Sequence, residues 1–151
     1  MIRNSFVAAI VLLASTPLFA GQVTKKYDFA PSGGIQDVNV EVDKVNVNSI
    51  VFKLDPQGLS AILSTKAGDA GARVRVDNNG YADAEVGIAI VLFDADGNIV
   101  AAGAGGTKVG FLRKGSRDTH QVTFDYVYRN LDKAKSFTIT LETQPKVVEK
   151  K

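Results

Sequence analysis

Apolar residues recur at every second position over most of the chain. Over residues 38–42, three valines alternate with Asn39 and Glu41, and the alternation returns over 72–76, 84–93, 119–128 and 137–141. This period predicts β-strands with one face in a core and the other in water. Val45 and Val47 are out of phase with the first valines, which indicates a bulge or turn near Asp43 and Lys44.

Turn-forming residues separate these strands. Asp55-Pro56-Gln57-Gly58 has the spacing of a β-turn, and Asn79-Gly80 suits the positive φ angles of a tight reversal. Asp94-Ala95-Asp96-Gly97 predicts a hairpin between the 84–93 strand and residues 98–102. Because the 84–93 strand is apolar on both faces, we expect it to be central. The glycine-rich run 103–110 predicts a flexible connection or a kinked edge.

About seven strands separated by turns predict an all-β fold, a two-sheet antiparallel immunoglobulin-like β-sandwich over residues 35–145. A small closed β-barrel is the alternative. Residues 131–135 predict a turn or a single helical turn. Residues 21–34 are expected to be a flexible N-terminal or edge segment that becomes ordered only by docking, and residues 146–151 a solvated tail.

The first twenty residues have the layout of a secretory signal peptide. A short start containing Arg3 precedes the apolar run 6–14, and the segment ends on Ala20, after which we expect cleavage. The apolar run is shorter than the ~20 residues that a membrane-spanning helix needs. The mature chain is therefore expected to be periplasmic or secreted, with no membrane span.

Composition narrows the chemistry. The 151 residues include no Cys, which excludes disulfides and thiolate metal sites. Of 18 basic side chains, Arg3 leaves with the leader, so 17 basic and 16 acidic side chains give the mature chain a charge of +1. Such a balance gives no general attraction to nucleic acid. We expect no cofactor.

The segment Ile90 to Gly97 resembles the FxLYD domain and related immunoglobulin-like domains of bacterial exported proteins. In these domains a strand ending in an aromatic residue and Asp leads into an Asp-Gly turn, and here Ile90 and Phe93 stand in place of the motif's Phe and Tyr. The similarity extends over Ala72 to Leu141, about half the chain, including Val74 to Gly80 and Lys114-Gly115-Ser116. It implies an exported immunoglobulin-like domain and transfers no catalytic residue.

Acidic turns are weak candidates for a calcium site. Asp94 and Asp96 supply oxygen ligands, and Asp77 and Asp83 are candidates for the same end of a sandwich. The stretch provides only the beginning of an EF-hand loop, and Asp and Gly are also the residues that make turns.

Two other signals point weakly to chemistry. Ser116, Asp118 and His120 have the residue types of a hydrolytic triad, but an extended segment separates its first and last members by about 13 Å. The glycine cluster 103–106 lacks the Gly-Lys-Ser/Thr ending and the helix of a phosphate-binding loop. We predict that the chain is not an enzyme.

A basic cluster is the remaining candidate surface. Arg113, Lys114 and Arg117 precede a strand that carries Tyr126 and Tyr128, and together they suggest an anionic or glycan-binding face. Scattered loop charges and core tyrosines account for the same residues.

Three functional hypotheses follow. The leading one is a non-enzymatic exported module that contacts another envelope or extracellular protein through loops or an edge strand. The second is a calcium- or glycan-binding domain that uses its acidic turns. The third is a hydrolase that depends on His120.

Overall fold

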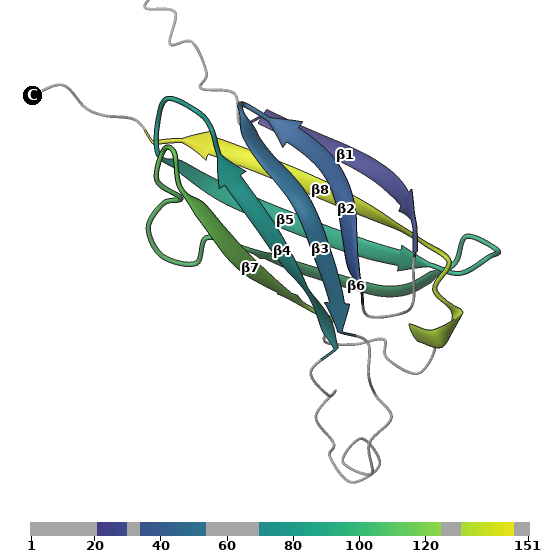
Figure 1. The fold of residues 1–151 in the computed structure, drawn as a ribbon. Helices are drawn as coiled ribbons and strands as arrows, with labels where there is room; N and C mark the ends of the chain where they lie inside the picture. Colours follow the sequence, from purple (N-terminus) through teal and green to yellow (C-terminus); the bar gives the residue numbers. More distant parts are fainter. Residues whose placement is uncertain (1–20, 30–33, 54–69, 125–130, 147–151) are drawn as a thin grey trace, which may run out of the picture.

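The computed structural model describes residues 21–29, 34–53, 70–124 and 131–146. These ranges contain eight strands and one short 3-10 helix (Figure 1). The elements are β1 (Gly21–Asp28), β2 (Ile35–Val42), β3 (Val45–Lys53), β4 (Gly71–Asn78), β5 (Ala84–Phe93), β6 (Ile99–Gly106), β7 (Arg117–Thr123), η1 (Leu131–Lys133) and β8 (Ser136–Pro145).

The strands form one antiparallel sheet in the order β1-β8-β5-β6-β7-β4-β3-β2. The outermost strands, β1 and β2, lie next to each other in Figure 1, so the sheet is nearly closed into a barrel. The predicted all-β class is confirmed, and the 84–93 strand lies between β8 and β6, as expected of a central strand. The predicted two-sheet immunoglobulin-like sandwich is wrong.

The sandwich prediction fails at the glycine-rich strand β6. Ala104 pairs with Thr123 of β7, and this pairing joins the two halves of the sheet. Gly103 and Gly105 permit the close approach, because a Cβ atom at either position would collide with a β7 carbonyl oxygen. A period of two specifies faces of strands and not which strands pair, so the sequence pattern does not reveal this join.

Side chains bridge the other seam, between β1 and β2. The Tyr27 hydroxyl accepts a hydrogen bond from the Asn39 N–H at 3.1 Å and lies 3.2 Å from the Asn39 carbonyl oxygen, to which it donates. Lys25 Nζ donates to the same carbonyl at 2.5 Å, and Gln36 Nε2 donates to the Asp28 carbonyl at 2.6 Å. Residues 21–28, within the segment expected to be flexible or an edge, thus form an edge strand docked on β8.

The inward faces of the strands make one core. Phe52 is at the centre of its aromatic part, with ring centroids 4.9 Å from Phe29 and 5.1 Å from Phe137. The phase slip seen in the sequence comes from a two-residue turn at Asp43 and Lys44, and a bulge at Asn48 of β3 shifts the phase again after Val47. The largest fully buried side chains are Phe124, Phe137, Ile50, Ile90, Leu92, Ile139, Leu141, Val40, Val45, Val47, Val74 and Val76.

Candidate functional site

Four segments gather at one end of the barrel, which we call the loop end (Figure 1). They are the β2–β3 turn (43–44), the β4–β5 loop (79–83), the β6–β7 loop (107–116) and the end of β8 (143–146). Backbone hydrogen bonds tie them together: Asn79 N donates to the Lys44 carbonyl at 2.9 Å, and Lys146 N donates to the Asp83 carbonyl at 2.8 Å. The loop end is therefore a connected surface.

Asn78 organises the β4–β5 loop from inside the barrel. Its side chain is 1% exposed, and Nδ2 donates to the carbonyls of Ala82 at 3.0 Å and Leu112 at 2.9 Å. Its Oδ1 accepts the Gly80 N–H at 2.9 Å. Gly80 is not among the residues with positive φ, and β4 pairs with β3 and β7. The expected tight reversal is instead a loop that crosses one end of the barrel, between strands that β6 and β7 separate in the sheet.

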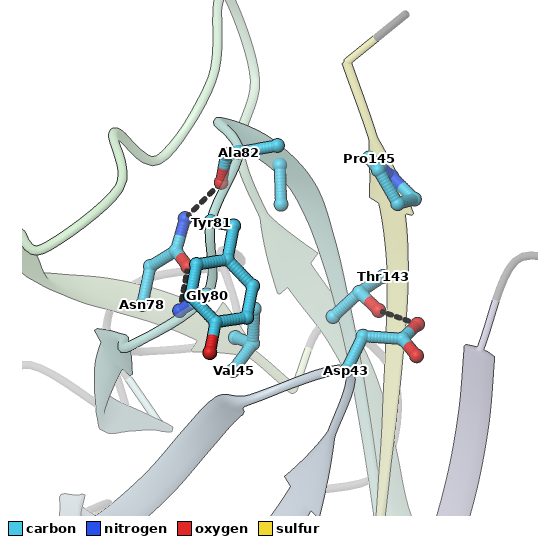
Figure 2. Close-up of a pocket in the computed structure, with 9 residues that line it drawn as sticks. Asp43, Val45, Asn78, Gly80, Tyr81, Ala82, Thr143 and Pro145 are labelled. Carbon is cyan, nitrogen blue, oxygen red and sulfur yellow. Dashed lines mark hydrogen bonds between the residues drawn. The ribbon is translucent and has the colours of Figure 1, made fainter.

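The crossing loop holds Tyr81 in the solvent. Its side chain is 85% exposed, which is unusual for so large a ring, and it borders a pocket of about 210 Å³ (Figure 2). Figure 2 shows Tyr81 facing Pro145 and Thr143 across this space, with Asp43 at its edge. The complete lining is Asp43, Val45, Asn78, Gly80, Tyr81, Ala82, Ala84, Thr143 and Pro145.

The β2–β3 turn supplies the charged groups of the pocket region. Asp43 Oδ2 accepts a hydrogen bond from Thr143 Oγ1 at 2.9 Å. Lys44 Nζ lies 4.5 Å from the centroid of the Tyr81 ring and donates to its hydroxyl at 3.1 Å. Both turn residues have positive φ, 49° at Asp43 and 63° at Lys44, a conformation that glycine, asparagine and aspartate adopt more readily than lysine.

The β6–β7 loop projects beside the pocket. Its two ends are anchored, because Thr107 N donates to the Val86 carbonyl at 2.9 Å and Leu112 pairs with Ala84. Between these anchors Val109 is 96% exposed. Lys146 Nζ covers the Phe111 ring at 4.7 Å from its centroid.

The predicted basic cluster is only partly available for binding. Arg117 forms an ion pair with Asp77 through Nε and Oδ1, with a second bond from Nη2 to Oδ2 at 2.8 Å. The Arg117 guanidinium holds the pKa of Asp77 below its usual range, and Asn48 donates to the same carboxylate at 2.7 Å. In the described part of the chain, the side chains of Arg113 and Lys114 have no such partner, and both residues are exposed.

The acidic candidates lie at opposite ends of β5. Asp77 and Asp83 are at the loop end, whereas Asp94 and Asp96 are in the β5–β6 hairpin at the far end (Figure 1). The ten-residue length of β5 separates the two groups by about 30 Å. The four aspartates therefore do not form one site, and no group of three His, Asp or Glu side chains in the described ranges is arranged to hold a metal ion. Asp94 and Asp96 as weak calcium candidates stay a prediction.

Asp94 uses its carboxylate to build the hairpin. Its Oδ1 accepts from Asp96 N at 2.9 Å and from Asn98 N at 2.8 Å, and its Oδ2 accepts from Asn98 Nδ2 at 3.1 Å. These hydrogen bonds lower the pKa of Asp94, and the bond from the Asn98 side chain makes the largest contribution.

The triad candidates do not contact one another. Ser116 Oγ donates to the Arg113 carbonyl at 2.6 Å, and Asp118 Oδ1 accepts from Thr119 N at 2.7 Å. His120 is only 6% exposed, on the inward face of β7, and its Nε2 has no hydrogen-bond partner. The arrangement offers no nucleophile activated by a base.

The remaining features singled out in the sequence are the glycine cluster and the two tyrosines. The glycine cluster 103–106 belongs to strand β6 and is not a phosphate-binding loop followed by a helix. Tyr126 and Tyr128 lie outside the described residues. Within those residues, no helix has the length and apolarity needed to cross a bilayer.

The pocket was not predicted from the sequence. The sequence pattern indicates only a bulge or turn at Asp43 and Lys44 and gives no role to Tyr81. An aromatic residue directly after Asn79-Gly80 is a usable signal, because aromatic rings in turns are seldom needed for the core. The proximity of Tyr81 to Lys44 depends on a contact 37 residues apart in the chain, which periodicity does not report.

Comparison with known proteins identifies no family. No family model matches the chain, and no curated protein sequence matches it. A chain in the structure of infectious bursal disease virus Gx strain shares 12% identity with a TM-score of 0.39. The match covers 86% of this chain and only 27% of that one, and it is too weak to indicate a function. The resemblance to FxLYD domains stays a prediction.

Proposed function

We propose that the chain is an exported, non-enzymatic binding module that docks to an acidic surface of another envelope or extracellular protein. The β6–β7 loop makes the contact. The observation that carries the proposal is the anchored projection of Val109, flanked by cations and by no acidic residue over residues 107–116.

The anchoring of this loop favours recognition. Asp83 Oδ1 accepts the Lys114 N–H at 3.1 Å, and Gly115 N donates to the Asn78 carbonyl at 2.7 Å. A loop held in this way loses little conformational freedom on binding, which favours affinity. An exposed valine provides an apolar anchor, and Lys108, Arg113 and Lys114 provide electrostatic complementarity to an acidic partner.

Site-specific photocrosslinking in cells that make the full chain tests this proposal. A photoreactive phenylalanine analogue at position 109 is expected to give a discrete protein adduct. The same analogue at Ile99, which is 61% exposed at the far end of the barrel, serves as the control position. We expect R113E/K114E to reduce the adduct at position 109 at least about tenfold.

The matched charge control is K133E/K135E, which changes the net charge equally at a site away from the loop end. It should leave the adduct intact. An adduct at 109 that survives R113E/K114E, or equal labelling from positions 99 and 109, would contradict the proposal. Export is tested separately by N-terminal sequencing of the protein from the periplasm or medium, with Gly21 as the expected first residue.

A further inference from the structure

We infer that the pocket beside Tyr81 is a binding site for a neutral saccharide ring. The inference is independent of protein docking by the β6–β7 loop, because it depends on residues of the β2–β3 turn, the β4–β5 loop and β8. Its starting observation is that an aromatic ring and a carboxylate line one pocket at the loop end, and that an ammonium group lies against the same aromatic ring.

The ring of Tyr81 provides the apolar surface. Although Lys44 Nζ approaches it to 4.5 Å, the residue remains 85% exposed, so ring surface is left for a ligand. Pro145 and Ala82 add apolar walls (Figure 2). The C–H face of a sugar ring is flat and apolar, and it buries well against such a surface.

Hydrogen-bonding groups of both kinds flank the ring. Thr143 occupies Oδ2 of Asp43, and Oδ1 of that carboxylate has no partner among the described residues. Lys44 Nζ uses one of its three donors on the Tyr81 hydroxyl. A sugar hydroxyl both donates and accepts, so the hydroxyls of one ring can use the carboxylate and the ammonium group.

The same two charges select against charged ligands. A cationic ligand at the Tyr81 ring would meet the Lys44 ammonium group, and an anionic ligand in the pocket would meet the Asp43 carboxylate. Asn78 adds no charge, and its amide is already satisfied by Ala82, Leu112 and Gly80. A neutral, hydroxyl-rich ligand with one apolar face fits all of these groups.

The backbone of the turn agrees with this assignment. Asp43 and Lys44 both hold positive φ angles, which aspartate tolerates and which are disfavoured for lysine. Strained conformations of this kind concentrate at binding and catalytic sites. Here the strained residue, Lys44, is the one that supplies the donor.

Saturation-transfer NMR on the full chain tests the site with glucose, galactose, mannose and N-acetylglucosamine, each at millimolar concentration. We expect transfer to the ring protons of at least one sugar. Tyr81→Ala should reduce the signal at least about tenfold, because a central aromatic anchor carries most of the contact. Tyr81→Phe keeps the ring and should retain most of the signal, and Asp43→Ala should weaken it.

Phe111→Ala is the matched control, since it removes a ring at the same end but outside the pocket. It should leave saturation transfer unchanged, as should R113E/K114E. Absence of transfer from all four sugars, or transfer that persists in a folded Tyr81→Ala variant, would overturn the inference. Loss of the signal in Phe111→Ala equal to that in Tyr81→Ala would also overturn it. None of these results bears on photocrosslinking at position 109.

Discussion

Two hairpin turns of this barrel each begin with aspartate, yet they are built differently. The β5–β6 turn runs from Asp94 to Asn98 and places Gly97 at φ +84°. The β2–β3 turn has two residues, Asp43 and Lys44, both at positive φ without a glycine. In the first turn a glycine takes the positive φ angle, whereas the second turn has no glycine to do so.

The difference also appears in where the side chains go. Both carboxylate oxygens of Asp94 accept hydrogen bonds from residues 96–98 of the same turn. Asp43 instead reaches Thr143, 100 residues away, and Lys44 reaches Tyr81. An acidic turn that consumes its own carboxylate has a structural role, whereas a turn that strains its backbone to present side chains elsewhere is the better functional candidate.

The largest effect on stability is expected from adding a side chain to the β5–β6 turn. Gly97→Ala should lower the free energy of unfolding by about 1–2 kcal/mol, because alanine is disfavoured at φ +84°. Nothing lies within 4 Å of the added Cβ, so the loss reports backbone conformation alone. Urea unfolding measures it.

Gly34→Ala is the matched control for that experiment. A Cβ at Gly34 also meets nothing within 4 Å, and its φ is not in the positive range. This variant should be neutral or stabilising by up to about 1 kcal/mol. Equal losses at positions 34 and 97 would show that the positive φ of Gly97 is not the cause of the loss.

Strand content and several turns could be predicted from the sequence, but the pairing of strands could not. The alternation over 84–93 and the Asp94 turn specify β5 and its hairpin correctly, because both are local signals. The join between β6 and β7 depends on glycines that let two backbones approach, and the same glycines suggested a weak connection. Long-range approach has no local signature in the sequence.

The candidate site shows the same limit. The sequence identified acidic residues correctly as turn formers but did not separate Asp94, whose turn is self-contained, from Asp43, whose carboxylate bonds β8. Arg117 was grouped with Arg113 and Lys114 because the three are close in sequence. Its pairing with Asp77, 40 residues away, removes it from that group.

Relieving the backbone strain of the β2–β3 turn should raise the free energy of unfolding, whereas Gly97→Ala should lower it. The double substitution D43N/K44G creates the Asn-Gly pair that two-residue hairpins prefer, and the new amide side chain retains an acceptor oxygen for Thr143. We expect a gain of about 1 kcal/mol in the free energy of unfolding, reduced by the lost contact between Lys44 and Tyr81. Urea midpoints measure the gain.

The same variant should lose saturation transfer from sugars, because it removes both the carboxylate and the ammonium group. Stability and binding would then change in opposite directions at one turn. A variant that unfolds more easily than the parent would contradict the assignment of strain to Lys44. Asp96→Asn, in the other hairpin, controls for loss of an exposed carboxylate.

The smallest effect on stability is expected from acid titration of the β5–β6 turn. Because the folded-state pKa of Asp94 is lowered by its bonds to Asn98 and the turn backbone, its carboxylate stabilises the fold above the unfolded pKa. That contribution is lost as the pH falls below the unfolded pKa and through the folded pKa. Asp94→Asn keeps an acceptor oxygen but removes the charge, so it should be less stable than the parent at pH 7 and should approach the parent's stability in acid.

Asp96→Asn, which removes a carboxylate without a hydrogen bond among the described residues, should keep the parent's slope. Urea midpoints between pH 7 and pH 3 distinguish the two variants. Equal slopes in both would mean that the Asp94 carboxylate contributes no more to its turn than an amide does.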